Sequence, residues 1–109
     1  MSEGNTLREL EEVTEKFAEA ESNRLYLMEF RKSKKAILMN EAERNNPKMP
    51  IAAQERYAYS HEDYLGLLEG LKVAIEKSVS LKFKIQIITM RFEQWRSKQA
   101  TLRQEMQIR

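Results

Sequence analysis

An apolar repeat that steps alternately by four and three residues through the second half of the chain most constrains its fold. Ten of the twelve repeat positions are apolar, and Ser78 and Gln99 are the polar exceptions. The apolar positions are Leu67, Leu71, Ala74, Leu81, Ile85, Ile88, Phe92, Trp95, Leu102 and Met106. A register kept over more than five heptads is typical of a coiled coil. We therefore expect a helix over about residues 61–106, with this stripe as the seam of a homo-oligomer.

A first long helix is predicted over about residues 6–45, which contain neither Gly nor Pro. Asn5 or Thr6 can serve as its N-cap, because Glu9 follows Thr6 at the capping-box spacing. Its apolar stripe begins with a four-three alternation, is interrupted at Arg24, and is expected to drift around the helix afterwards. The stripe comprises Leu10, Val13, Phe17 and Ala20, then Leu27, Phe30 and Ile37.

The segment between the long helices predicts a bend. Pro47 should end the first helix after Asn45, and Pro50 suits the first position of a short helix over about residues 50–58. Ser60, with Asp63 three residues later, is expected to cap the second long helix. The predicted fold is all-α: one domain (residues 1–109) forming a long antiparallel helical hairpin with a short helix at the bend, coiled-coil-like and oligomeric.

Further apolar residues lie on other sides of the second long helix. They are Val73, Ile75, Val79, Phe83, Ile87 and Met90. One partner helix would not cover all of this surface, so it favours a bundle completed by other subunits.

Several function classes are disfavoured by what the sequence lacks. It has no Cys and one His, His61, which argues against thiol chemistry, Cys- or His-based metal sites and most hydrolase triads. No phosphate-binding loop or HExxH motif occurs. We therefore expect a protein that is not an enzyme and has no cofactor or metal. The N-terminus does not resemble a signal peptide and no apolar run is long enough to span a membrane, so we expect a cytoplasmic protein.

The net charge of +2 conceals four blocks of alternating sign. Formal charges are −5 for residues 1–30, +4 for 31–49, −3 for 50–70 and +6 for 71–109. This alternation suits antiparallel helices that pair acidic with basic segments, and it also leaves two basic blocks that could contact a polyanion.

The densest basic cluster is Arg31, Lys32, Lys34 and Lys35. It could contact phosphates without sequence preference. A solvated helix face, or ion pairs with nearby acidic blocks, is the more common role for such a run and is favoured about two to one.

A second basic set lies in the last third of the chain, within the predicted helix: Lys82, Lys84, Arg91, Arg96, Lys98 and Arg103. Lys84, Arg91 and Lys98 recur every seven residues and so line one side of the predicted helix. Such a ladder can follow a nucleic-acid backbone, or can flank a coiled-coil seam and pair with Glu; the two interpretations weigh equally.

Aromatic residues gather at two places. Tyr57, Tyr59, His61 and Tyr64 crowd the bend, where a packed corner is slightly favoured over stacking on unpaired bases. Phe92 and Trp95 lie on the seam, and seam aromatics are more often core than ligand platform.

Residues 20–109 resemble small phage- or prophage-encoded helical proteins of recombination regions. The resemblance rests on residues 26–36, 52–55, 57–61, 64–71 and 90–96. The layout is also similar to recombination mediators of the UvsY type, which place a basic helix before a tyrosine-rich corner and a long C-terminal helix. The resemblance implies an all-helical, oligomeric protein that binds single-stranded DNA and helps a recombinase to load, in the cytoplasm of a phage-infected or lysogenic bacterium. It makes the Arg31–Lys35 cluster a DNA-contact candidate.

Two functions follow as expectations. One is a non-enzymatic recombination accessory protein that binds single-stranded DNA as a homo-oligomer, with a recombinase or other phage or host protein as partner. The alternative is a helical adaptor or inhibitor that binds a host or phage protein and not DNA.

Overall fold

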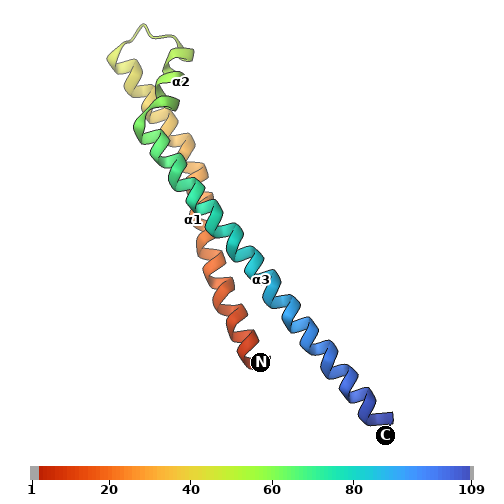
Figure 1. Ribbon diagram of the computed structural model, residues 1–109. Coiled ribbons are helices and arrows are strands. Elements are labelled where there is room, and N and C mark those ends of the chain that lie inside the picture. The colour runs from red at the N-terminus through yellow and green to blue at the C-terminus, as the bar shows by residue number, and fades with distance from the viewer. Residues whose placement is uncertain (1–2, 109) are drawn as a thin grey trace. The chain divides into compact units, whose positions relative to one another are not determined.

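The computed structural model describes residues 3–108 and confirms the predicted helical hairpin (Figure 1). Helix α1 spans Glu3–Asn45, α2 spans Ile51–Ser60 and α3 spans Glu62–Ile108. These are the three helices of the described residues, which contain no strand. The long helices α1 and α3 are antiparallel, and the short α2 lies at the bend, as the positions of the two prolines predict.

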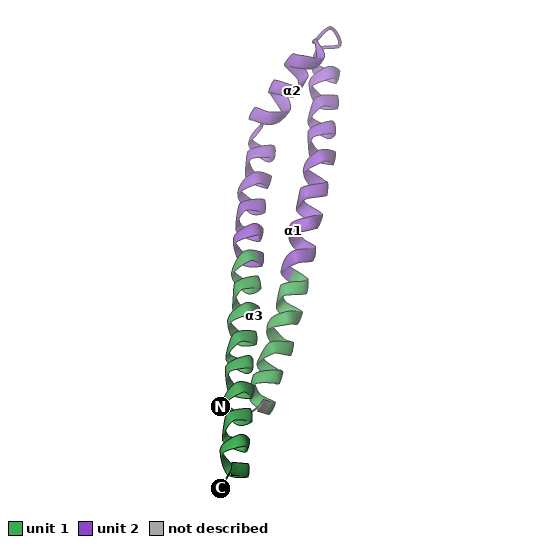
Figure 2. Ribbon diagram, turned by 90° about the vertical axis from the view of Figure 1, so that its right-hand side faces the viewer, with its two compact units in different colours: residues 1–19, 79–109 green, residues 20–78 purple. Residues whose placement is uncertain are grey.

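The hairpin divides into two compact units, which are coloured separately in Figure 2. Unit 1 combines residues 1–19 with residues 79–109, and unit 2 consists of residues 20–78. Each unit therefore contains one segment of α1 and one segment of α3, and unit 2 also contains the bend with α2.

The core of unit 2 lies at the bend. Leu38, Ala58 and Tyr64 form a buried cluster, one residue from each of the three helices. Half-buried Met39, Tyr57 and Leu68 pack against it. In unit 1, the most buried large side chain is Ile88, which is 1% exposed. Both centres bury aliphatic or aromatic carbon, which is the main source of stability in a folded chain.

The apolar repeat of α3 is covered within the single chain along most of its length. From Leu67 to Gln99, every repeat position is buried or half-buried. The last two positions, Leu102 and Met106, are 51% and 75% exposed. Packing within the single chain therefore accounts for the burial of Leu67, Leu71, Leu81, Ile85, Ile88, Phe92 and Trp95, so their burial needs no second subunit. The oligomeric state stays a prediction.

The predicted drift of the α1 stripe is wrong. One line of buried and half-buried positions keeps a strict four-three alternation from Thr6 to Leu38. They are Thr6, Leu10, Val13, Phe17, Ala20, Arg24, Leu27, Arg31, Lys34 and Leu38. Phe30 and Ile37, assigned to the stripe from sequence, are 37% and 50% exposed. Long Arg and Lys side chains can lay their methylene groups along an apolar seam while their charged ends reach its rim, so three of them occupy seam positions.

Two predicted helix caps are also wrong. Thr6 lies inside α1, which begins at Glu3, and Thr6 is buried. Ser60 is the last residue of α2, and its hydroxyl donates to the carbonyl of Arg56 at 2.6 Å. The cap of α3 is His61 instead, because its Nδ1 accepts the backbone N–H of Asp63 at 3.0 Å. Pro50 precedes α2, and its carbonyl accepts the N–H groups of Ala53 and Gln54.

None of the helices in residues 3–108 is long and apolar enough to cross a membrane. The same residues contain no cluster of three or more His, Cys, Asp or Glu side chains that could hold a metal ion.

Candidate nucleic-acid interface

The basic cluster of α1, Arg31–Lys35, lies in unit 2 beside acidic side chains. Lys34 Nζ lies 3.5 Å from Asp63 Oδ2 of α3, and Lys35 Nζ lies 3.7 Å from Glu55 Oε1 of α2. Lys32 Nζ lies 3.2 Å from Glu29 Oε1 in the preceding helical turn. Three of the four cations in this cluster therefore already have an anionic partner.

Lys35 is held by aromatic contacts as well as by charge. Its Nζ lies 4.8 Å from the centre of the Tyr59 ring, within the range of a cation–π contact. The side-chain hydrogen bond with Tyr59, reinforced by the charge of Glu55, raises the pKa of Lys35 above its usual value despite the opposing effect of burial. Lys35 thus serves the contact between α1 and the bend.

The tyrosine-rich bend is a packed corner, which was the slightly favoured interpretation of the sequence. Tyr64 is 6% exposed and lies edge-to-face with Tyr59 at a centroid distance of 5.3 Å. Tyr57 meets His61 edge-to-face at 5.6 Å. Burial, followed by the nearby Glu41 carboxylate, raises the pKa of Tyr57. Only Tyr59 of these rings is largely exposed, at 45%.

Arg31 lies at a shallow pocket that α1 forms with the bend. The pocket is lined by Arg31, Lys32, Lys35, Tyr59 and Tyr64. Because Lys32 and Lys35 also contact Glu29 and Glu55, acidic groups compete with any phosphate that approaches this pocket.

The second basic set lies on the α3 segment of unit 1, and its environment is different. All six members, Lys82, Lys84, Arg91, Arg96, Lys98 and Arg103, are exposed. Within the described chain, Arg96 is the only member in an ion pair, with its Nη1 3.4 Å from Glu93 Oε1. That pair is itself about 61% exposed on both sides, so its attraction is weak and readily screened. These cations remain available to an external anion.

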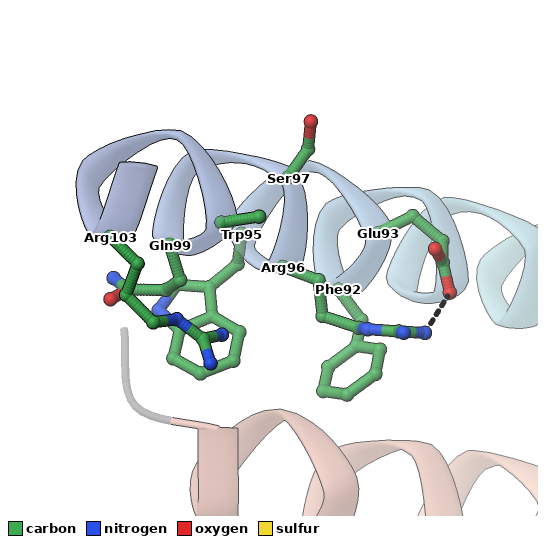
Figure 3. Close-up of a pocket in the computed structure, with 8 residues that line it drawn as sticks. Phe92, Glu93, Trp95, Arg96, Ser97, Gln99 and Arg103 are labelled. Atoms are coloured by element: carbon green, nitrogen blue, oxygen red, sulfur yellow. Dashed lines mark hydrogen bonds and ion pairs between the residues drawn. The ribbon is translucent and has the colours of Figure 1, made fainter. Parts of the chain in front are cut away.

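Phe92 and Trp95 lie on the same segment and form a stacked aromatic pair. Their ring centres are 6.1 Å apart with an interplanar angle of 25°. Figure 3 shows both side chains projecting from α3 toward the N-terminal part of α1, with Arg96 and Arg103 beside them, whereas Ser97 points away. These residues, with Gln99, line a concave surface. Phe92 and Trp95 lie in the seam, as predicted, and both are half-buried there, so part of each side chain stays exposed.

A polar layer in the seam of unit 2 was missed by the sequence analysis. Ser78, which is 3% exposed, donates to Glu21 Oε2 at 2.6 Å. Arg24 Nε donates to Glu21 Oε1 at 2.8 Å, and a second guanidinium nitrogen contacts the same carboxylate. The available signal was that Arg24 and Ser78 each interrupt an apolar repeat. Such layers fix the register of packed helices.

The predicted contact residues therefore fall into two groups. Unit 2 holds the paired cluster Arg31, Lys32, Lys34 and Lys35, and unit 1 holds the exposed set Lys82, Lys84, Arg91, Arg96 and Lys98 with Arg103.

Comparison of the chain with protein-family models, curated proteins and solved structures finds no match.

Proposed function

We propose that this chain is a non-enzymatic accessory protein that binds single-stranded DNA, of the recombination-mediator type, acting as a homo-oligomer in the cytoplasm of a phage-infected or lysogenic bacterium. The contact is made chiefly by the basic set of α3 in unit 1. The supporting observation is that these six cations are exposed and that only Arg96 has an acidic partner among the described residues.

The spacing of the set supports contact with an extended polyanion. Lys84, Arg91 and Lys98 recur every seven residues on one side of α3, which places successive cations about 10 Å apart along the helix axis. A flexible single strand can follow such a line, because phosphate contacts require charge and spacing but no base sequence.

The test is a titration of a labelled single-stranded oligonucleotide, followed by fluorescence anisotropy and light scattering at low and high salt. We expect binding at low salt that does not depend on base sequence. The logarithm of the association constant should fall linearly with the logarithm of the salt concentration. Each phosphate contacted should add about −0.7 to the slope of this line. Light scattering reports the oligomeric state in the same samples. Absence of binding at low salt would rule out the proposed function.

A second candidate function, a helical adaptor that binds protein and not DNA, is favoured by an apolar stripe on the outer face of α3 in unit 1. The stripe comprises Val79, Phe83, Ile87 and Met90, which are 44%, 55%, 46% and 59% exposed. Spacings of four, four and three residues place them on one face. Lys82, Lys84 and Arg91 are interleaved with the stripe, so the partner that it fits is an amphipathic helix with acidic flanks.

Two synthetic amphipathic peptides with the same apolar face, one with acidic and one with basic flanks, test this candidate. In titration calorimetry the adaptor function predicts binding of the acidic peptide only, and loss of that binding in Phe83→Ser. If neither peptide binds while the oligonucleotide does, the adaptor function is rejected.

A further inference from the structure

We infer that Trp95, stacked on Phe92 and flanked by Arg96 and Arg103, is a platform on which an unpaired nucleobase of the bound strand stacks. This inference rests on the proposed function and adds a base-contacting site to its phosphate contacts. It concerns unit 1 alone, because all of these residues belong to the α3 segment of that unit.

The site lies where the packed seam of α3 ends. Phe92, Trp95 and Gln99 are the last half-buried positions of the α3 seam, and residues 100–108 are all exposed. The seam therefore ends in a concave surface lined by two aromatic side chains, Phe92 and Trp95, together with polar and charged ones, among them Glu93, Arg96, Gln99 and Arg103. Figure 3 shows the Trp95 and Phe92 rings extending beside the guanidinium groups of Arg103 and Arg96.

The residues that line the site offer a stacking surface and polar groups for a nucleotide. An indole ring offers a large apolar face for stacking, which is worth about 1–3 kcal/mol per base and tolerates any base. Arg96 and Arg103 lie one and eight positions after Trp95 in α3, so a base on the indole would have cations within reach for its flanking phosphates. Gln99 adds an amide that can donate to and accept from a base edge.

The two arginines of the site are accessible to a phosphate. Arg103 has no ion pair within residues 3–108, and Arg96 has only its exposed pair with Glu93. A phosphate can replace that carboxylate at little cost because both partners are already solvated. The site thus combines stacking surface and free positive charge, which is the combination that single-strand-binding grooves use.

The experiment uses the only tryptophan of the chain as its own reporter. The intact protein is titrated with a short oligothymidylate and with a base-free strand that carries the same number of phosphates. Anisotropy of labelled strands reports binding, and tryptophan emission reports stacking on Trp95. We expect both strands to bind, but only oligothymidylate to quench the emission.

Variants sharpen the test. Trp95→Ala should weaken oligothymidylate binding about 5- to 150-fold, the equivalent of the stacking energy, and should leave binding of the base-free strand unchanged. Trp95→Phe should retain most of the affinity. Tyr26→Ala, which removes an exposed aromatic ring from α1 in unit 2, is the matched control and should bind as the parent does. Circular dichroism verifies that each variant keeps its helix content.

The outcomes separate the two proposals. Equal affinity for both strands, with no quenching, would overturn the stacking platform and leave phosphate binding standing. Absence of binding by either strand at low salt would overturn the proposed function and the platform together.

Discussion

The two basic regions of this chain differ in what surrounds them more than in how many cations they carry. In unit 2, Lys32, Lys34 and Lys35 lie within 3.2 to 3.7 Å of carboxylate oxygens, and Lys35 also lies over a tyrosine ring. In unit 1, the α3 set is exposed and has a single, exposed ion pair. The denser cluster is thus largely paired within the fold, and the more dispersed set is largely without acidic partners among the described residues.

This contrast follows from the charge blocks. Residues 50–70 carry a formal charge of −3 and fold back against residues 31–49, which carry +4. In unit 1, the acidic α1 segment faces the basic α3 segment, but no ion pair joins them in the part of the chain that the structure describes. Opposite charge along two helices therefore favours their pairing in general, whereas only local geometry decides which cations are neutralised.

The largest expected effects are on the free energy of unfolding, and they test whether a buried apolar residue in each unit stabilises the helices that carry its basic region. Ile88→Ala in unit 1 and Leu38→Ala in unit 2 should each lower the free energy of unfolding by about 2–5 kcal/mol, because both residues are almost fully buried. Leu102→Ala, in the exposed end of the seam, should change it by less than about 0.5 kcal/mol. Urea unfolding followed by circular dichroism measures all three. A small effect of Ile88→Ala would mean that α3 of unit 1 is not anchored as described.

The next prediction compares the loss of stability on removing a carboxylate at the seam with the loss on removing one at the surface. Glu21→Ala removes the acceptor of the buried Ser78 hydroxyl and of Arg24, and should cost about 1–3 kcal/mol. Glu29→Ala breaks an ion pair with Lys32 in which both side chains are about 70% exposed, and should cost less than about 0.5 kcal/mol.

A double-mutant cycle checks the origin of the larger cost. Glu21→Ala combined with Ser78→Ala should recover part of the stability, because the buried hydroxyl is removed with its acceptor. Strictly additive losses would contradict the hydrogen-bonded polar layer.

The smallest expected effect is a loss of stability at alkaline pH that arises in unit 2. The pKa of Tyr57 is raised in the folded chain from 10.0, mainly by burial, and that of Lys35 is raised from 10.5, mainly by its hydrogen bond with Tyr59. Between the unfolded and folded pKa values the folded chain holds more protons, so stability falls as pH rises above about 10.

Denaturant unfolding at pH 9 and pH 11 measures this effect, with Tyr57→Phe as the comparison. The variant lacks one of the two groups and should lose less stability than the parent over this interval. Equal losses would show that Tyr57 titrates alike in the folded and unfolded chain.

Much of the fold could be predicted from the sequence because α3 keeps an almost purely apolar repeat. The α1 repeat was harder, since Arg24, Arg31 and Lys34 occupy seam positions and hide its register. Their position depends on the partner across the seam, such as Asp63 for Lys34, and no local pattern shows that. The prediction of Ser60 as a cap failed for a different reason, because its hydroxyl donates instead to the Arg56 carbonyl one turn back.

The candidate site was predictable only as a list of cations. Which of them are free depends on contacts between segments distant in sequence, as between Lys35 and Glu55. The role of Trp95 depends on where the packed seam ends, which a repeat that continues to Met106 does not reveal.

The most direct measurement of the central claim compares two triple variants that remove the same charge. Lys84→Gln/Arg91→Gln/Lys98→Gln removes three exposed cations of unit 1, and Lys32→Gln/Lys34→Gln/Lys35→Gln removes three paired cations of unit 2. Affinity for a labelled single-stranded oligonucleotide is measured over a range of salt concentrations. We predict that the unit 1 variant loses about tenfold or more in affinity and that its salt slope falls by about 2, whereas the unit 2 variant stays within about threefold of the parent. The reverse result, with loss confined to the unit 2 variant, would contradict the account.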